Sequence, residues 1–275
     1  MPTDETTTNL FYLHPDYSTT RMGEGGLRTR GCFKKSSPDK PLITVITVVF
    51  NGVAHFFDTF NSVINQTYDN VEYIIIDGGS TDGTVDIIKQ YEDQIDYWVS
   101  EKDAGIYDAM NKGLSKASGD FVININIGDL LLDIPVNELL NAIQLNSLVV
   151  GFNVELGENG LFKPRSGLIN KFDNCLHHQG TFYSCKIAER YDVRYKVFAD
   201  FDLNQRLLKN RYKITLYDKT VSRHSEDGLS HNREHFGEVW QIIEKNQGKF
   251  HVLVAHVYFR LRGLWKRIKK LITLF

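Results

Sequence analysis

The run Leu42-Ile43-Thr44-Val45-Ile46-Thr47-Val48-Val49-Phe50 is the clearest structural signal in this sequence. It is short, apolar and rich in β-branched residues, which is typical of a strand buried on both faces of a sheet. Asn51-Gly52 ends the run, and apolar residues then recur at helical spacing over 56–64. A second run of the same kind, over 71–76, stops at Asp77-Gly78-Gly79-Ser80.

The alternation continues along the chain. We expect a helix over 81–91, capped by Ser80 or Thr81, then a strand over 96–100, a helix over 105–117 and a strand over 121–126. Strand, loop and helix in repetition predict an α/β fold with a parallel sheet and right-handed crossovers. Later segments with strand character are 148–155, 181–185 and 213–221, and those with helical character are 201–209 and 234–246.

Three regions differ in composition. Residues 1–40 are polar and lack periodicity, so we expect a loosely ordered extension. Residues 41–248 are expected to form one domain with two halves, 41–130, where strand and helix alternate, and 131–248, where the loops are longer. Residues 249–275 are expected to form a basic amphipathic helix.

The bulk composition of the 275 residues, with 42% hydrophobic and 24% charged residues, indicates a soluble globular body. Three distant cysteines predict neither disulfides nor a zinc site, which fits a reducing cytoplasm. The N-terminus is polar and acidic, unlike a secretory signal. No uncharged apolar stretch reaches the roughly 18 residues of a spanning helix.

The charge is unevenly distributed. Residues 250–275 hold six basic residues and no acid, which leaves 26 basic and 34 acidic residues in the remainder. The acidic remainder makes nucleic-acid binding unlikely, whereas the basic end suits an anionic membrane surface. On a helical wheel one side carries Val257, Leu261, Leu264, Trp265, Ile268, Leu271 and Ile272, and the opposite side carries Arg262, Lys266, Lys269 and Lys270. A helix packed on the protein's own body is the alternative.

Acidic residues follow the predicted strands. Asp77 directly follows a buried strand, so its carboxylate could bind a base or a ribose at the sheet edge, or could hold the turn that follows. Asp103 follows the third strand, and Gly105 would let the backbone pass close to a ligand. The neighbouring Glu101 is expected in a solvated loop.

Asp108, Asn111 and Lys112 are three and four residues apart, so a helix would place them on neighbouring faces. They could contact a sugar or a diphosphate, or form a solvated helix face.

Asp129 follows the strand over 121–126 after only two residues, one of them a glycine. Hard cations bind carboxylate and phosphate oxygens, so one carboxylate with several waters would suffice for Mn²⁺ or Mg²⁺ on a diphosphate. The alternative is an ordinary turn aspartate.

Further polar residues lie in the second half. His178 and Gln179 precede a predicted strand and could bind acceptor or phosphate, or serve the fold. A general base must be a positioned acid or histidine, and Asp200 fits that need. Asp202 cannot share a helix face with Asp200, so it fits a supporting role. His224 lies on a late loop that could fold over a diphosphate.

With these motifs the chain resembles the inverting glycosyltransferases of family 2, which have the GT-A fold, and it is particularly similar to those of bacterial colanic-acid and capsule assembly. The resemblance covers about residues 41–230. Its motifs here are Thr47–Gly52, Asp77–Thr84, Asp103–Gly113, Gly128-Asp129, His178-Gln179 and Ala199–Leu203. The family usually shows Asn-Ser-Asp-Asp or Asn-Ala-Gly-Asp, whereas Asn126-Ile127-Gly128-Asp129 lacks the first metal acid.

The resemblance implies a mostly parallel central sheet with helices on both faces, followed by the C-terminal amphipathic helix. It implies Asp200 as the catalytic base and Asp129 as the ligand of Mn²⁺ or Mg²⁺. The half over 41–130 is expected to bind the nucleotide-sugar, and the half over 131–248 the acceptor. The residues expected at the nucleotide-sugar are Thr47, Val49, Asn51, Asp77, Asp103, Asp108, Asn111 and Lys112. Those expected on the acceptor and diphosphate side are His178, Gln179, Asp202 and His224.

The implied reaction is a single displacement, in which Asp200 removes the acceptor hydroxyl proton and the anomeric carbon inverts. The donor would be a nucleotide diphosphate sugar, with UDP expected, and the acceptor a glycan or polyprenyl-linked glycan at the inner face of the plasma membrane. A catalytically silent nucleotide- or glycan-binding protein would have no use for both Asp129 and Asp200. A sugar-phosphate nucleotidyltransferase would want a basic, glycine-rich loop after its first strand, and residues 50–55 contain no Lys or Arg.

Overall fold

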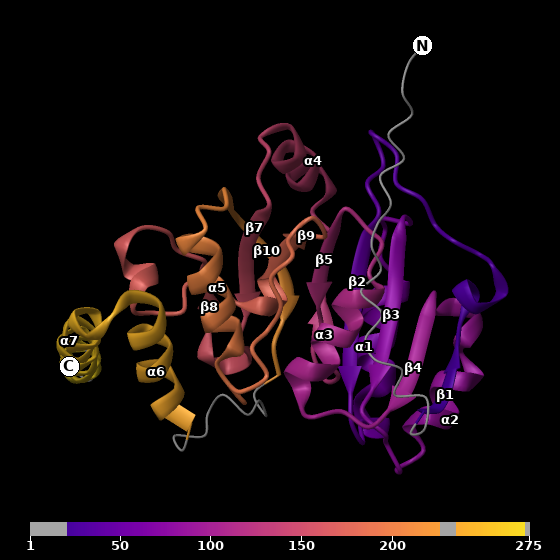
Figure 1. Ribbon diagram of the computed structural model, residues 1–275, viewed down its shortest axis with the longest axis horizontal. Coiled ribbons are helices and arrows are strands. Elements are labelled where there is room, and N and C mark those ends of the chain that lie inside the picture. Colours follow the sequence, from indigo (N-terminus) through magenta and orange to yellow (C-terminus); the bar gives the residue numbers. More distant parts are fainter. Residues whose placement is uncertain (1–20, 226–234, 273–275) are drawn as a thin grey trace.

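The computed structural model describes residues 21–225 and 235–272, and side chains up to residue 262 with the exception of Asn159. Ten strands of the described chain form one sheet in the order β1-β4-β3-β2-β5-β9-β7-β10-β6, with β8 paired to β7. Figure 1 shows the sheet running across the molecule from β1 at one end, with α6 and α7 beyond the other.

The strands are β1 (Arg21–Gly25), β2 (Ile43–Val49), β3 (Val71–Asp77), β4 (Tyr97–Glu101), β5 (Phe121–Asn124), β6 (Leu130–Leu131), β7 (Val149–Glu155), β8 (Leu161–Phe162), β9 (Thr181–Ser184) and β10 (Ile214–Arg223). The α-helices are α1 (Phe56–Ile64), α2 (Thr84–Gln90), α3 (Ile106–Lys116), α4 (Val136–Gln144), α5 (Ala199–Lys209), α6 (Phe236–Gln247) and α7 (Lys249–Ile272).

The predicted parallel sheet is confirmed. β2 pairs in parallel with β3 and β5, and β3 pairs in parallel with β4. The second half adds the antiparallel strand β9 between β5 and β7, and a parallel β7–β10 pair.

Helices cover both faces of the sheet, which is why the strands read as continuous apolar runs. One core layer lies between the sheet and α1, α2 and α4, and the other between the sheet and α3, α5 and α6. Successive β2 side chains alternate between the layers, with Val45 and Val49 in the first and Ile46 and Val48 in the second.

The carboxyl ends of the parallel strands share one edge. Val49, Asp77 and Ser100 lie side by side in register across β2, β3 and β4. The chain after β5 reaches the same edge, because the Ile127 amide donates to the Val48 carbonyl at 3.2 Å. The predicted polar loops therefore leave the sheet together.

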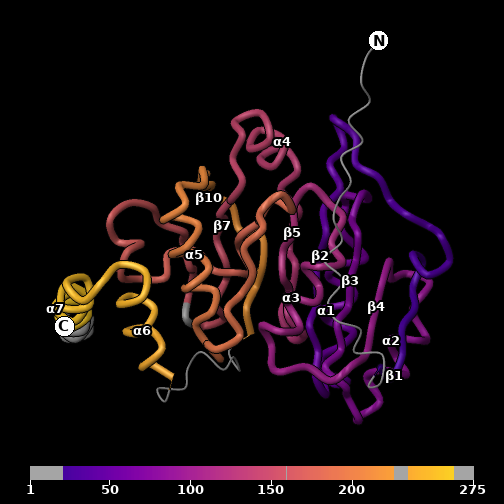
Figure 2. Tube along the Cα trace, viewed as in Figure 1, coloured from indigo at the N-terminus to yellow at the C-terminus, as the bar shows by residue number. Residues whose placement is uncertain are grey.

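Residues 21–40 correct the expectation of a loosely ordered extension. They contain the edge strand β1, antiparallel to β4, and a 3₁₀ helix over Leu27–Arg30. Figure 2 shows this indigo segment passing along the outer side of the sheet before it enters β2. The Arg28 guanidinium holds it by donating to Glu72 at 3.0 Å, a partner 44 residues away. Residues 1–20 lie outside the described residues.

The expected cap of α2 is also corrected. The helix begins at Thr84 after Gly83, whose φ of 98° suits glycine. The Asp82 carboxylate accepts the Thr84 amide at 3.1 Å, so neither Ser80 nor Thr81 is the cap.

Besides β1, the strands β6 and β8 and the helix α4 were not predicted. Among the described residues, no helix combines the length and the apolarity needed to cross a bilayer.

Candidate active site

Asp129 lies in the turn between β5 and β6. Gly128 makes the turn with a φ of 89°, and its amide donates to the Thr59 hydroxyl of α1 at 2.9 Å. The same hydroxyl donates to the Asp129 carbonyl at 2.8 Å. Thr59 thus fixes the loop that carries the acid.

The Asp129 carboxylate is 3% exposed and faces groups from two later segments. Its Oδ1 accepts the Ser225 amide at 2.7 Å and lies 3.0 Å from His224 Nδ1, directly after β10. Its Oδ2 accepts a hydrogen bond from the side-chain amide of Gln179, which lies in the turn before β9. The structure therefore brings Asp129, Gln179 and His224 together, while their roles toward a substrate stay predictions.

Asp200 lies in the first turn of α5 and is buried. Its Oδ1 accepts the Phe201 amide at 2.7 Å, and its Oδ2 accepts the Asn174 side-chain amide at 3.0 Å. His178 Nδ1 lies 3.6 Å from the same Oδ2. The carboxylate is thus oriented by two donors and faces an imidazole.

His178 connects the surroundings of the two acids. Its Nε2 lies 3.2 Å from the Asn126 amide, in the loop of Asp129, while its Nδ1 faces Asp200. Gln179, the next residue, contacts Asp129. Asp129 and Asp200, which are far apart in the chain, therefore border the same part of the molecule.

Three buried polar atoms in this region have no hydrogen-bond partner among the described residues: Asn126 Oδ1, His178 Nδ1 and Gln179 Oε1. Buried polar groups are normally paired, so a cluster of unpaired ones calls for an explanation such as a bound polar ligand. Two of these atoms belong to residues beside the acids, since Gln179 contacts Asp129 and His178 faces Asp200.

Histidine rings pack beside the acids. His177 stacks on His178 with ring centroids 5.0 Å apart and lies 5.3 Å from the ring of His224. Burial lowers the pKa of His177 well below its usual value, and the two neighbouring histidines lower it further. The Nδ1 atom of the neutral His177 ring accepts a hydrogen bond from the backbone N–H of Gln179 at 3.3 Å, and so helps to position that residue.

Asp77 is fully buried and organises its own turn. Its carboxylate accepts the backbone amides of Gly79 and Ser80 and the hydroxyls of Ser80 and Ser100. These contacts favour the turn-holding alternative. Contact of Asp77 with a nucleotide stays a prediction.

Asp103 lies next to this turn. A Cβ at Gly78 would collide with its carboxylate, so the glycine permits the close approach of the two loops. Burial raises the pKa of Asp103, although the Gly105 amide, which donates to it at 2.8 Å, acts in the opposite sense.

The β2 residues differ in exposure. Thr47 is buried and its hydroxyl accepts from Tyr73, and the Val49 side chain belongs to a core layer. Asn51 is exposed with a φ of 50°, and its Oδ1 accepts the Thr81 amide at 2.9 Å. Of these, only Asn51 presents its side chain at the surface.

The charged group at the start of α3 is largely internal. Lys112 is buried and pairs with Glu101 at 3.0 Å and with Asp108 at 3.6 Å. Glu101, expected in a solvated loop, is 5% exposed and also pairs with Arg21, so that expectation is wrong. Lys112 and Asp108 thus hold the loop that contains Asp103.

Asn111 is buried and exchanges two hydrogen bonds with the backbone of Tyr191, at 2.8 and 2.9 Å. Asp202 is fully buried and binds Arg206 at 2.8 Å and Lys245 at 2.9 Å, which ties α5 to α6. Both arrangements favour supporting roles, and contact with substrate stays a prediction for each.

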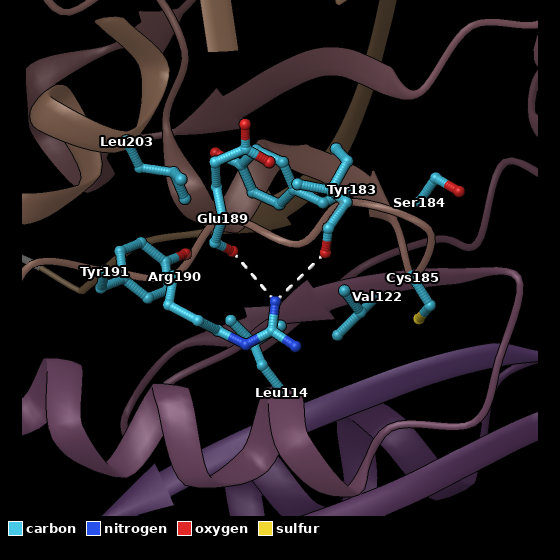
Figure 3. A pocket seen from close by; sticks show the side chains of 10 residues that line it. Leu114, Val122, Tyr183, Ser184, Cys185, Glu189, Arg190, Tyr191 and Leu203 are labelled. Carbon is cyan, nitrogen blue, oxygen red and sulfur yellow. Dashed lines mark hydrogen bonds between the residues drawn. The ribbon is translucent and has the colours of Figure 1, made fainter. Parts of the chain in front are cut away.

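A separate pocket lies between α3, β9 and the following loop (Figure 3) and contains none of the predicted site residues. The Arg190 guanidinium there donates to backbone carbonyls, including those of Ile187 and Glu189. Burial raises the pKa of the Cys185 thiol to about 12. With a committed guanidinium and a protonated thiol, this pocket offers less chemistry than the region of Asp129 and Asp200.

Comparison with known proteins identifies the family. Residues 44–201, more than half of the chain, match the glycosyl transferase family 2 domain. The chain belongs to that family. The match begins in β2 and ends directly after Asp200, so it includes both acids.

Curated relatives carry matching names. An uncharacterized glycosyltransferase of Mycobacterium tuberculosis is 45% identical over 83 residues, which are 30% of this chain and 32% of the relative. The putative teichuronic acid biosynthesis glycosyltransferase TuaG of Bacillus subtilis is 42% identical over 86 residues, 30% of this chain and 34% of its own length. A PGL/p-HBAD biosynthesis glycosyltransferase of Mycobacterium bovis is 29% identical over 66% of this chain and 75% of its own. The chain thus spans about a third of the first relatives it matches.

Solved structures confirm the GT-A fold. TarS of S. aureus in complex with UDP-GlcNAc superposes with a TM-score of 0.60 at 17% identity, covering 74% of this chain and 66% of TarS. The mannosyltransferase PcManGT of Pyrobaculum calidifontis, in complex with GDP-Man and Mn²⁺, gives a TM-score of 0.52 at 17% identity, covering 86% and 69% of the chains.

The sequence analysis gave no role to two residues of the region, Asn126 and Asn174. Asn126 was quoted only as the first residue of the motif that ends at Asp129. Asn174 lies in a loop without periodicity, and nothing local indicates its contact with Asp200.

Proposed function

We propose that this chain is an inverting glycosyltransferase that moves a sugar from a nucleotide diphosphate sugar to a hydroxyl of a glycan or polyprenyl-linked acceptor in bacterial surface polysaccharide synthesis. The observation that carries the proposal is that Asp129 and Asp200, remote in the chain, meet two adjacent residues: Gln179 contacts Asp129, and His178 faces Asp200. One acid for the donor diphosphate and one for the acceptor hydroxyl are what a single displacement requires.

Asp200 is the general base of the proposed reaction. Asn174 and the Phe201 amide fix its carboxylate, which accepts the acceptor proton as the hydroxyl oxygen attacks the anomeric carbon. The His178 ring faces the carboxylate, with Nδ1 3.6 Å from Oδ2.

The residues present fit a divalent cation, Mn²⁺ or Mg²⁺. Asp129 Oδ1 and His224 Nδ1 are 3.0 Å apart, close to the spacing of about 3 Å between neighbouring octahedral ligands at about 2.1 Å from the ion. Among the described residues, no group of three or more His, Cys, Asp or Glu side chains could hold a metal. Such an ion would therefore take most ligands from the diphosphate and water, and would stabilise charge on the leaving group.

UDP is the proposed nucleotide. The structural neighbour TarS was solved with UDP and UDP-GlcNAc, which supports UDP, while the GDP-Man and Mn²⁺ of PcManGT support a nucleotide sugar bound with metal. The proposed location is the inner face of the plasma membrane, where polyprenyl-linked acceptors lie.

Thermal unfolding tests the donor site. The wild type is heated with a panel of nucleotide diphosphate sugars, with and without Mn²⁺; a donor at about 100 times its Kd stabilises by about 2.7 kcal/mol. We expect one donor to raise Tm in the presence of Mn²⁺, and Asp129→Asn to lose that increment. Asp58→Asn, a change of an exposed acid on α1, is the matched control. The donor-site proposal fails if no donor shifts Tm or if Asp129→Asn responds like the wild type.

A further inference from the structure

Helix α7 packs on the body through one side only. Ala255 is fully buried, and Val252 and Phe259 pack against the same core layer as α6. The ring of Phe259 contacts Trp240 of α6 edge-on, and the Arg262 guanidinium donates to Asp173 at 2.5 Å. Residues 252, 255, 259 and 262 thus define the side that faces the protein.

The opposite side of α7 carries a stripe of large apolar residues. Phe250 is 72% exposed, Leu253 65%, Val257 53% and Leu261 60%. At about 100° per residue these four lie within about 40° of one line along the helix. Four such side chains in a continuous row form a contiguous apolar patch, which marks an interaction surface rather than ordinary exposure.

The side chains beside the stripe are basic. Lys249, His256 and Arg260 are the remaining exposed residues of the described part of α7, and that part contains no acid. The sequence beyond it adds Lys266, Arg267, Lys269 and Lys270, again without an acid. The charged residues of α7 beside the apolar row are therefore all basic, and an acid of α6, Glu244, lies 4.0 Å from the Lys249 ammonium.

Helix α7 does pack on the protein's own body, but through the side opposite to its apolar stripe. If the apolar side packed on the protein, Val257 and Leu261 would be buried and Arg262 would face solvent, which is the reverse of the arrangement found. The other residues of the predicted apolar side, from Leu264 onward, lie outside the described side chains.

We propose that Phe250, Leu253, Val257 and Leu261, with Lys249 and Arg260, bind the surface of an anionic lipid bilayer, with α7 lying in the interface. An apolar row enters the acyl boundary while cations beside it contact anionic headgroups. A second copy of this chain fits less well, because pairing two such faces would bring cations of the same sign together.

The test is co-sedimentation of the full chain with vesicles of phosphatidylcholine alone or mixed with phosphatidylglycerol. We expect binding to the mixed vesicles, weakened by salt, and a loss of about tenfold or more in the triple variant Leu253→Gln, Val257→Gln, Leu261→Gln. The matched control places the same three changes on exposed apolar residues of the body, Leu161→Gln, Leu168→Gln and Val193→Gln, and should bind like the wild type.

Three results would overturn the proposal: equal binding to both kinds of vesicle, unchanged binding by the triple variant, or no vesicle binding combined with self-association that the triple variant abolishes. The last would identify a second copy as the occupant. The inference rests on the proposed membrane location, but its assay uses neither donor nor acceptor. Its failure is therefore distinguishable from failure of the transferase proposal.

Discussion

Replacement of Asp200 by asparagine removes the proposed base while leaving the side chain nearly the same size. The asparagine oxygen can still accept the Phe201 amide, which lies 2.7 Å from Oδ1. Loss of a general base typically lowers the rate by about 10²–10⁴-fold. We expect that loss in the rate of sugar transfer, with donor binding retained, because the acid proposed for the donor side is Asp129.

The same change has a structural cost that can be separated from the chemical one. The new amide nitrogen would replace Oδ2 and face the Asn174 amide, so two donors would meet in a buried place. An unsatisfied buried group costs about 1–3 kcal/mol, and Asn174 cannot rotate freely because its oxygen accepts from Asn204 at 3.0 Å. A drop in stability is therefore expected for Asp200→Asn.

The double variant Asp200→Asn, Asn174→Asp restores one donor and one acceptor to this contact. We expect it to recover the stability but not the transfer rate, because its carboxylate is attached to a different loop. The assay is release of nucleoside diphosphate in the presence of acceptor, alongside thermal unfolding of each variant. Transfer by Asp200→Asn within a few fold of the wild type would refute the assignment of the base.

Two further expectations concern supporting residues. Asn111→Ala should lower stability by about 1–3 kcal/mol, because the buried backbone N–H and C=O of Tyr191 both lose their partner. The rise in Tm caused by the donor should stay the same as in the wild type. A smaller rise would instead indicate that Asn111 contacts the donor. For pH, burial keeps His177 neutral in the folded state, whereas the unfolded chain gains a proton below about pH 6.5. The contribution of neutral His177 to stability is thus complete above that pH and is lost as pH falls toward the lowered folded-state pKa. Tm measured from about pH 7 to 5 should therefore fall more steeply for the wild type than for His177→Asn. Parallel curves for the two proteins would contradict this.

The parallel half of the fold was predictable because its signals are local. A strand buried on both faces is a short run of β-branched residues, and β2 and β3 each show one. The segment 21–40 gave no such signal. Its strand β1 contains two glycines and is mostly exposed, so only its pairing with β4 defines it.

Charged residues were harder to assign. Glu101 stands in a polar run and looked solvated, but one of its partners, Arg21, is 80 residues away. Whether a carboxylate is solvated depends on such remote cations, which no local pattern contains. The same holds for Asn111, whose amide contacts a residue 80 positions later.

The acids of the candidate site differ in where their partners come from. Three of the four donors to Asp77 lie within three residues of it, so its turn could form without the rest of the fold. The partners of Asp129 come from 50, 95 and 96 residues later. Burying a carboxylate among donors from distant segments requires the second half of the domain to be in place, and it costs free energy that the turn itself does not need. A long-range arrangement of this kind serves a site better than it serves a turn, which is why Asp129, rather than the equally buried Asp77, is the stronger candidate for the donor diphosphate.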